Sequence, residues 1–276
     1  MDNLFTSCII ILLIDPMKMY VACVVLGLSA LVVLPGFIGK ETSKTQVIAH
    51  RGAWKKQGLP QNSLAALDNA IRLGCFGSEF DVHMAADMGL FVSHDHVIQN
   101  VAIEKSTSAE LAAVKLSNGE SLPTLEAYLL QGKKQKKTRL VLEIKPSQLG
   151  KERSLLLAQK CVEMVQKTKT QRLVDYISFD YEVCKKVKEL DPKAQVAYLN
   201  GDKTPAECAA DGLDGLDYNQ NVYKKKEEWI QQAQQLNQTL NVWTVNTQQQ
   251  MEWFVEKNFD FITTDEPERL LEMLKK

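Results

Sequence analysis

Short apolar runs alternate with longer amphipathic stretches from residue 46 almost to the end of the chain. Most of the runs are largely hydrophobic and bounded by polar residues, which is typical of strands buried on both faces of a parallel sheet. They predict eight strands: Gln46–His50, Ser78–His83, Arg139–Ile144, Leu173–Ser178, Gln195–Leu199, Gly215–Tyr218, Asn241–Val245 and Phe261–Thr264.

The stretches between the runs carry apolar residues at helical spacing. They predict helices at Ser63–Leu73, Glu152–Lys167, Tyr181–Leu190, Thr204–Asp211, Lys224–Leu236, Thr247–Lys257 and Glu266–Leu274. We expect Asn62 to cap the first of these helices, and Asn246 or Thr247 to cap the sixth. Strand–helix units in this number favour a single α/β domain over residues 41–276, a closed (β/α)₈ TIM barrel. An open doubly wound sheet is the alternative, although no G-x-G-x-x-G follows a strand to support a dinucleotide.

The segment between Asp81 and Arg139 is too long for one crossover. We expect it to hold a short hairpin ending at His94, followed by helices at Thr107–Val114 and Thr124–Leu130. Excursions of this kind over a barrel mouth commonly carry binding groups.

Residues 1–40 differ from the rest of the chain by being strongly apolar. Met19 to Ile38 follows Lys18 and has the length of a membrane span, about 20 residues, or of a long signal peptide. Met17 is a plausible true start, because a basic residue then opens the segment. We expect a cleaved signal peptide or a retained anchor, and both stay open. In either case the barrel is expected outside the cytoplasm, in the periplasm or the extracellular space or anchored to the membrane.

The composition narrows the function classes. A net charge of −1 leaves no basic footprint for nucleic acid. The 6 cysteines show no metal-binding spacing, so buried free thiols are the expectation.

Charged residues stand on the runs where a barrel would place its active site, at the carboxyl ends of the strands. Glu79 and Asp81 are two apart and share a face, as do Glu143 and Lys145. Charges pointing into a barrel are costly unless they are paired or bind metal. Three carboxylates select a hard cation, Mg²⁺ or Ca²⁺, and a structural salt-bridge network is the alternative. Lys145 and Arg51 are natural clamps for phosphate oxygens.

Two of the 4 histidines, His50 and His94, adjoin the same predicted pocket. Imidazoles exchange protons near neutral pH, so the pair can supply an acid and a base to the two sides of a phosphorus atom. We expect His83 and His96 to be loop or rim histidines outside the chemistry.

Six short motifs occur in one order along the chain: His50-Arg51-Gly52, Glu79-Phe80-Asp81, His94-Asp95, Glu143-Ile144-Lys145, Trp243-Thr244-Val245-Asn246 and Thr264-Asp265-Glu266-Pro267. With these motifs in this order, the chain resembles the glycerophosphodiester phosphodiesterases, a (β/α)₈ family related to phosphoinositide phospholipases. Each motif is weak alone, and the ordered set of six is specific. One motif departs from the family pattern: Pro60-Gln61-Asn62 stands in place of Pro-Glu-Asn.

The resemblance implies a role for each site residue. Glu79, Asp81 and Glu143 would hold the metal, and His50 and His94 would be the acid/base pair. The other implied roles are phosphate binding by Arg51 and Lys145, a glycerol pocket lined by Trp243, and support of these groups by Asn62 and Asp95.

The implied reaction is metal-dependent hydrolysis of a glycerophosphodiester, a small molecule, to glycerol 3-phosphate and an alcohol. The alternatives are a phospholipase D-like or other phosphodiesterase acting on a lipid headgroup, and a non-catalytic glycerophosphodiester-binding module. The headgroup, the native metal, the oligomeric state and the first nucleophile (water or the glycerol 2-hydroxyl) stay open, as does membrane association through the N-terminal segment.

Overall fold

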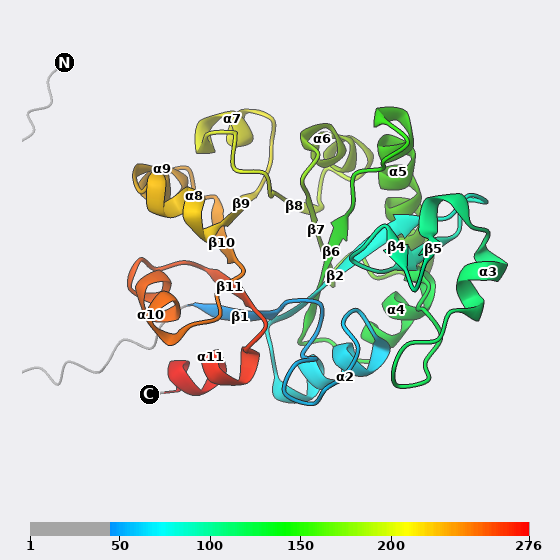
Figure 1. The fold of residues 1–276 in the computed structure, drawn as a ribbon. Coiled ribbons are helices and arrows are strands. Elements are labelled where there is room, and N and C mark those ends of the chain that lie inside the picture. The colour runs from blue at the N-terminus through cyan, green and yellow to red at the C-terminus, as the bar shows by residue number, and fades with distance from the viewer. Residues whose placement is uncertain (1–44, 276) are drawn as a thin grey trace, which may run out of the picture. The chain divides into compact units, whose positions relative to one another are not determined.

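The computed structural model describes residues 45–275, whose strands form a closed ring surrounded by helices (Figure 1). Eight parallel strands make the ring: β1 (Gln46–Ala49), β2 (Gly77–Met84), β6 (Arg139–Ile144), β7 (Val174–Ser178), β8 (Gln195–Tyr198), β9 (Gly215–Asn219), β10 (Thr239–Trp243) and β11 (Phe261–Thr264). They pair in the order β1-β11-β10-β9-β8-β7-β6-β2, and β2 pairs back onto β1 where Ile48 lies opposite Gly77. The predicted barrel is confirmed, and the open sheet is excluded.

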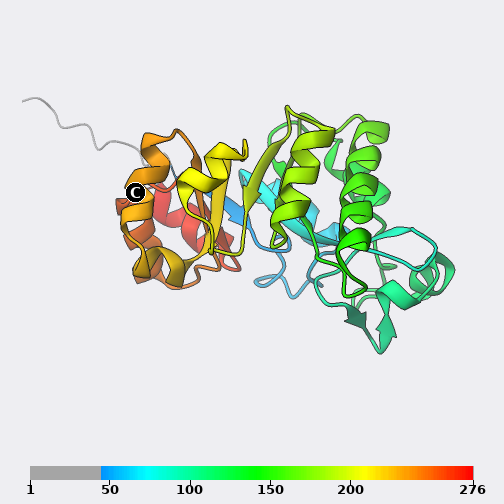
Figure 2. The ribbon, with the colours of Figure 1, turned by 90° about the horizontal axis from the view of Figure 1, so that it is seen from above.

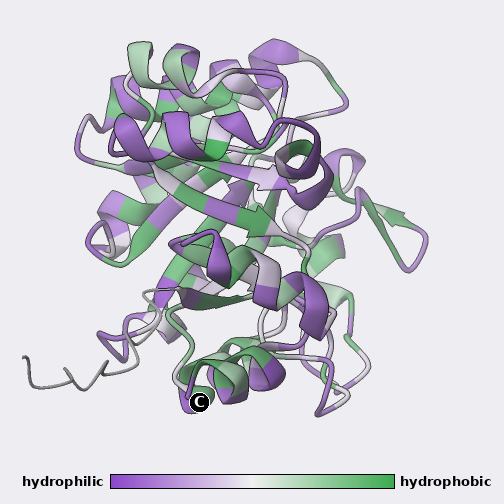
Figure 3. Cartoon of the chain, turned by 90° about the vertical axis from the view of Figure 1, so that its left-hand side faces the viewer, coloured by the Kyte–Doolittle hydropathy of each residue, from purple (hydrophilic) through white to green (hydrophobic). Residues whose placement is uncertain are grey.

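Helices cover the outside of the ring (Figure 2). They are α2 (Leu64–Leu73), α4 (Leu125–Gly132), α5 (Lys151–Thr168), α6 (Tyr181–Leu190), α7 (Pro205–Ala210), α8 (Gln220–Lys225), α9 (Glu228–Gln235), α10 (Gln248–Glu256) and α11 (Pro267–Leu274). Many positions on the outer helices are hydrophilic, while the strands are banded with hydrophobic positions (Figure 3). This is the pattern expected of a parallel sheet that is covered on its outer face.

The main core lies between the ring and the helices, and it leaves the opposite strand face free for the site. On β2, Phe80 and Val82 belong to this core, and Phe80 is fully buried and stacks on Tyr128 with ring centroids 4.1 Å apart. Because side chains alternate along a strand, Glu79 and Asp81 face the barrel interior. The outward packing of β2 therefore aims its two carboxylates into the barrel.

The segment between β2 and β6 leaves the barrel wall before it returns as α4. It contains β3 (Leu90–Val92), β4 (Val97–Ile98), β5 (Val101–Ala102), the 3₁₀ turn η1 (Ile103–Lys105) and α3 (Ser108–Ala113). β3 pairs antiparallel with β2, and β4 with β5. This excursion has a small hydrophobic core of its own, which includes Phe91, Ile103 and Leu111. The predicted hairpin and its two following helices are confirmed.

Three local predictions were wrong. Ser63, not Asn62, caps α2: its side chain accepts from the Ala66 N–H, while Asn62 has a left-handed backbone (φ 61°) and turns its amide to Asp81. The helix predicted at Lys224–Leu236 is two helices, α8 and α9. The strand predicted to start at Asn241 starts two residues earlier, at Thr239.

Cys75, Cys161, Cys184 and Cys208 are buried free thiols, as predicted. Cys8, Cys23 and the whole predicted leader lie outside the described residues. Within residues 45–275, no helix has both the length and the apolar character needed to cross a membrane.

Candidate active site

Three buried carboxylates meet at the carboxyl ends of β2 and β6. Glu79 and Asp81 come from β2, and Glu143 lies directly opposite Asp81 in the register of the two strands. One oxygen from each of the three lies within 4.8 Å of the others. The structure therefore brings the predicted trio together.

The electrostatics of this trio are unfavourable without a cation. Burial, followed by the charges of Asp81 and Glu143, raises the pKa of Glu79 well above its usual value. Burial and the Asp81 charge raise the pKa of Glu143 to about 8, although Lys145 opposes them. One oxygen of Glu79, Oε1, has no hydrogen-bond partner within the described part of the chain. A buried, unpartnered oxygen among three convergent carboxylates fits a hard divalent cation.

Lys145 is paired with two members of the trio. Its Nζ lies 2.7 Å from Glu143 Oε1 and 3.1 Å from Asp81 Oδ1. Burial alone would raise the pKa of Asp81, but Lys145, followed by His94, Asn62 and Arg51, holds it below its usual value. Asp81 is thus the member of the trio held ionised by its protein neighbours.

Arg51 adopts a left-handed backbone with φ 56°, which aims its N–H inward. That N–H donates to Glu79 Oε2 at 2.8 Å, and Nη1 donates to Gln61 Oε1 at 2.7 Å. Gln61 is the residue that departs from the family pattern, and its side chain is a neutral amide. It therefore neutralises less of the Arg51 positive charge than a carboxylate at this position would. Asn62 comes directly after Gln61 in the chain, and the side-chain amide of Asn62 donates to Asp81 Oδ2 at 2.9 Å.

His50, just after β1, is held by a carboxylate for which the sequence predicted no role. Its Nδ1 lies 2.8 Å from Asp265 Oδ1, at the end of β11. Asn246 supports this carboxylate, donating to Asp265 Oδ2 at 2.8 Å and accepting from the Asp265 N–H at 2.9 Å. Asp265 lies in a motif quoted from the sequence, so its place in the family pattern was the signal that pointed to it.

His94 also has a carboxylate partner, which comes from the next residue in the chain: its Nδ1 lies 2.7 Å from Asp95 Oδ1. Burial lowers the pKa of His94, and Asp81 and Asp95 oppose this only in part. The placement expected for His83 was wrong. His83 is buried within β2, its Nε2 contacts the His94 carbonyl oxygen at 3.1 Å, and its ring lies edge-on to His96 with centroids 4.6 Å apart. It thus underlies His94 and is not at the rim.

One cavity of about 90 Å³ opens at the carboxyl ends of the barrel strands, and it is lined by Glu79, Glu143, His50, His94 and Trp243. Asp81 does not line it, but one of its oxygens lies within 4.8 Å of oxygens of Glu79 and Glu143. Trp243 is fixed by its Nε1, which donates to the Asp217 carbonyl oxygen at 2.9 Å, and by edge-on packing on Phe179. The Asp217 side chain also lines this cavity, although no sequence motif predicted it there. Burial raises its pKa to about 7, and within residues 45–275 its Oδ1 has no hydrogen-bond partner. Its run, Gly215–Tyr218, gave no motif to single it out.

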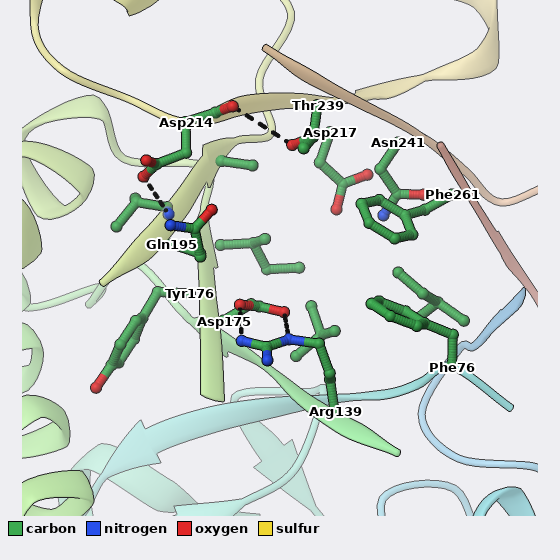
Figure 4. Close-up of a pocket in the computed structure, with 15 residues that line it drawn as sticks. Phe76, Arg139, Asp175, Tyr176, Gln195, Asp214, Asp217, Thr239, Asn241 and Phe261 are labelled. Atoms are coloured by element: carbon green, nitrogen blue, oxygen red, sulfur yellow. Dashed lines mark hydrogen bonds and ion pairs between the residues drawn. The ribbon is translucent and has the colours of Figure 1, made fainter. Parts of the chain in front are cut away.

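A second cavity, of about 370 Å³, occupies the other end of the barrel interior, where the strands begin (Figure 4). Arg139 and Asp175 pair across one wall, and Phe76 stacks on Phe261 at another, with centroids 4.9 Å apart. Figure 4 shows Asp217 with its carboxyl turned into the barrel interior, so this residue stands between the two cavities. Among residues 45–275, no histidine lines the lower cavity.

Comparison with known proteins gives a consistent family. The model of the glycerophosphoryl diester phosphodiesterase family matches residues 50–269. A glycerophosphodiester phosphodiesterase of Caldanaerobacter subterraneus subsp. tengcongensis is 27% identical over 248 residues, which are 84% of this chain and 99% of that protein.

Solved structures agree in fold. A glycerophosphodiester phosphodiesterase from Parabacteroides distasonis is 44% identical with a TM-score of 0.83, covering 85% of this chain and 98% of that one. A phosphodiesterase of Oleispira antarctica, solved in complex with the product sn-glycerol-3-phosphate, is 22% identical with a TM-score of 0.71, covering 84% and 97%. The chain belongs to the glycerophosphoryl diester phosphodiesterase family and is an enzyme of the phosphoric diester hydrolase class.

Proposed function

We propose that this protein hydrolyses glycerophosphodiesters to glycerol 3-phosphate and an alcohol. The observation that carries the proposal is the pair His50 and His94, each with Nδ1 on a carboxylate, which line one cavity together with Glu79 and Glu143 of the three convergent carboxylates. Overall, a P–O bond to the alcohol breaks, a P–O bond to an oxygen derived from water forms, and the alcohol leaves with a proton. The product bound to the Oleispira antarctica relative supports glycerol 3-phosphate as a ligand of this fold.

The family depends in general on a divalent metal ion, and Glu79, Asp81 and Glu143 are the residues that would hold it here. Their oxygen ligands suit Mg²⁺ or Ca²⁺. The bound ion would supply charge neutralisation at the phosphate and a hydroxyl of lowered pKa. Without it, two of the three carboxyls have raised pKa values and retain protons more readily.

The two histidines move the protons. A carboxylate at Nδ1 leaves Nε2 of each ring to exchange a proton with the substrate. Two such groups serve the two oxygens that exchange at phosphorus, one as acid and one as base. Arg51 and Lys145 orient the phosphate by charge-assisted hydrogen bonds, and Trp243 lines the space for glycerol.

The predicted leader enters the proposal through location. Residues 1–40 are apolar enough to export the chain or to anchor it, and the polar linker Glu41–Gln46 separates them from the barrel. We therefore expect a protein starting at Lys44 to be soluble and active, and the full chain to be exported or membrane-bound. Cell fractionation tests this, and N-terminal sequencing of exported protein separates cleavage from a retained anchor. Full-length protein found only in the cytosol would refute it.

The products identify the reaction. ³¹P NMR of glycerophosphocholine incubated with enzyme and Mg²⁺ or Ca²⁺ should show glycerol 3-phosphate. Diacyl phosphatidylcholine, run beside it, tests the phospholipase D alternative. Conversion of the diacyl lipid alone would favour that alternative, and binding of glycerophosphocholine without turnover would favour a non-catalytic module.

A further inference from the structure

A side pocket adjoins the catalytic cavity on the side of the β3–β5 excursion. Its volume is about 150 Å³, against about 90 Å³ for the catalytic cavity. Arg51 and His94 line both spaces. The two pockets therefore meet at the residues proposed to bind the phosphate and to exchange its protons.

The side pocket changes character with distance from Arg51. Polar groups lie near the shared residues: Gln61, Asn62, Ser93 and Asp95. The remaining walls are aliphatic: Val92, Val97, Ile98, Leu116 and Leu122. Asp95 is its carboxylate, and among residues 45–275 no cation besides Arg51 lines it.

The aliphatic wall is fixed by the excursion itself. Gln99 and Asn100 both have positive φ, 48° and 67°, which makes the tight turn between β4 and β5. Gln99 Nε2 donates to the Lys115 carbonyl oxygen at 2.7 Å and so ties this turn to the segment that follows α3, just before Leu116. β4 and β5 project away from the barrel wall (Figure 2).

The far side of the pocket is tied to the barrel. Glu120 accepts from the backbone N–H groups of Leu64 at 3.0 Å and Ala65 at 3.2 Å, at the start of α2. Leu122 belongs to the core of the excursion, and Leu116 packs against that core. The pocket is thus bounded by packed and hydrogen-bonded residues, which limits the ordering cost of binding.

We propose that this side pocket receives the leaving alcohol of the substrate and selects alcohols with an aliphatic body and no negative charge. The inference rests on the proposed function. With the phosphate at Arg51, the glycerol end lies with the carboxylates and Trp243, so the second ester group must pass His94 into the side pocket.

The walls set the expected preference. Each methylene buried against them raises kcat/KM by about fourfold, the equivalent of about 0.8 kcal/mol. A carboxylate at the end of the same alcohol finds no free cation there and meets Asp95. Burying such an unpaired charge is unfavourable.

Matched substrates test this preference. kcat/KM is measured with the full chain and saturating Mg²⁺ or Ca²⁺ for glycerophosphodiesters of methanol, butanol and 4-hydroxybutanoate. We expect the butyl diester to exceed the methyl diester at least tenfold, and the carboxylate analogue to fall at least tenfold below the butyl diester. Equal values for methyl and butyl, or for butyl and the carboxylate, would overturn the inference and leave the proposed function standing. Hydrolysis of none of the three would overturn both.

Variants locate the effect. Val97 is 51% exposed, so Val97→Asp is compatible with folding, and it should erase most of the butyl-over-methyl ratio. Leu236→Asp is the matched control: Leu236 is 45% exposed at the end of α9, outside the pocket, and the ratio should not change. Ile98→Ser is the second pocket variant, and circular dichroism checks the fold of all three. An unchanged ratio in folded Val97→Asp and Ile98→Ser would contradict the assignment.

Discussion

His50 Nδ1 and Asp265 Oδ1 lie 2.8 Å apart, although 215 positions separate them in the sequence. Burial raises the pKa of the Asp265 carboxyl, but the hydrogen bond and charge of His50 outweigh it and leave this pKa below its usual value. An ionised carboxylate can only accept, so Nδ1 carries the hydrogen and Nε2 of the neutral ring keeps its lone pair. The closing of the barrel, which places β11 beside β1, thus sets the tautomer of His50.

Asp265→Asn should lower kcat by roughly 10² or more, within the range for loss of a general acid or base. An amide nitrogen can donate to Nδ1 and so favours the opposite tautomer, with Nε2 protonated. The measurement is kcat/KM against pH with saturating metal. Glu266→Gln, at the half-buried neighbouring position that pairs with Lys55, is the control and should change little. A normal rate for Asp265→Asn would contradict the role of this pair.

His50→Ala and His94→Ala should each lower kcat by about 10² to 10⁴ while the protein stays folded. His96→Ala is the matched control because its ring lies outside the catalytic cavity, with Nδ1 3.6 Å from Glu104. His96→Ala should lower kcat by well under a hundredfold. Steady-state kinetics of the three variants decide, and a loss in His96→Ala equal to that in His50→Ala would show the site to be wrongly assigned.

His83 shows where the sequence was a poor guide. The run Ser78–His83 located the strand, but alternation alone could not tell that the excursion folds back over its end. Pairing of β3 with β2 covers His83, and the buried ring then lies under the His94 backbone. Asp265 was missed for a related reason: it contacts His50 from another strand, and only the closed barrel brings the two together. Asp217 was missed because its side chain reaches the catalytic cavity only once the barrel has closed.

The barrel itself was predictable because short runs rich in apolar residues alternate regularly with helical patterns along the chain. The six ordered motifs likewise led to the carboxylates and both active-site histidines. The prediction that Asn62 caps α2 failed because asparagine is both a good cap and a good hydrogen-bond donor. Its contact with Asp81 moved the cap to Ser63. Whether Asn62 caps the helix or contacts Asp81 depends on the tertiary structure, which the local sequence does not determine.

His83 should make the stability pH-dependent. Burial lowers its pKa to about 4, below the unfolded value of about 6.5. Between these values the unfolded chain binds more protons, so this contribution to stability is lost as the pH falls from about 6.5 to about 4. Thermal melts of parent and His83→Ala from pH 4 to 7.5 should therefore converge toward acid pH, with the variant less stable near neutrality because the His94 carbonyl oxygen loses its donor. A constant difference across that range would contradict the account.

Glu143 should act in the opposite direction in metal-free protein. Its folded pKa of about 8 lies above the unfolded value of about 4.3. Its contribution to stability is therefore present below about pH 4.3 and is lost as the pH rises through about 8. Melts in EDTA should show the parent losing stability relative to Glu143→Gln across this window. Adding Mg²⁺ or Ca²⁺ should restore the parent, since ligand binding favours the folded state, and should do so less for the variant. Parallel pH curves in EDTA would contradict a buried, proton-binding Glu143.

The central claim is that Glu79, Asp81 and Glu143 hold a cation required for the hydrolysis that His50 and His94 catalyse. Its most direct test is glycerol 3-phosphate release from glycerophosphocholine by protein dialysed against EDTA, before and after addition of Mg²⁺ or Ca²⁺, with Asp81→Asn measured alongside. The account predicts no release in EDTA, recovery with one of the two ions in the parent, and little recovery in Asp81→Asn. Full release in excess EDTA would contradict it.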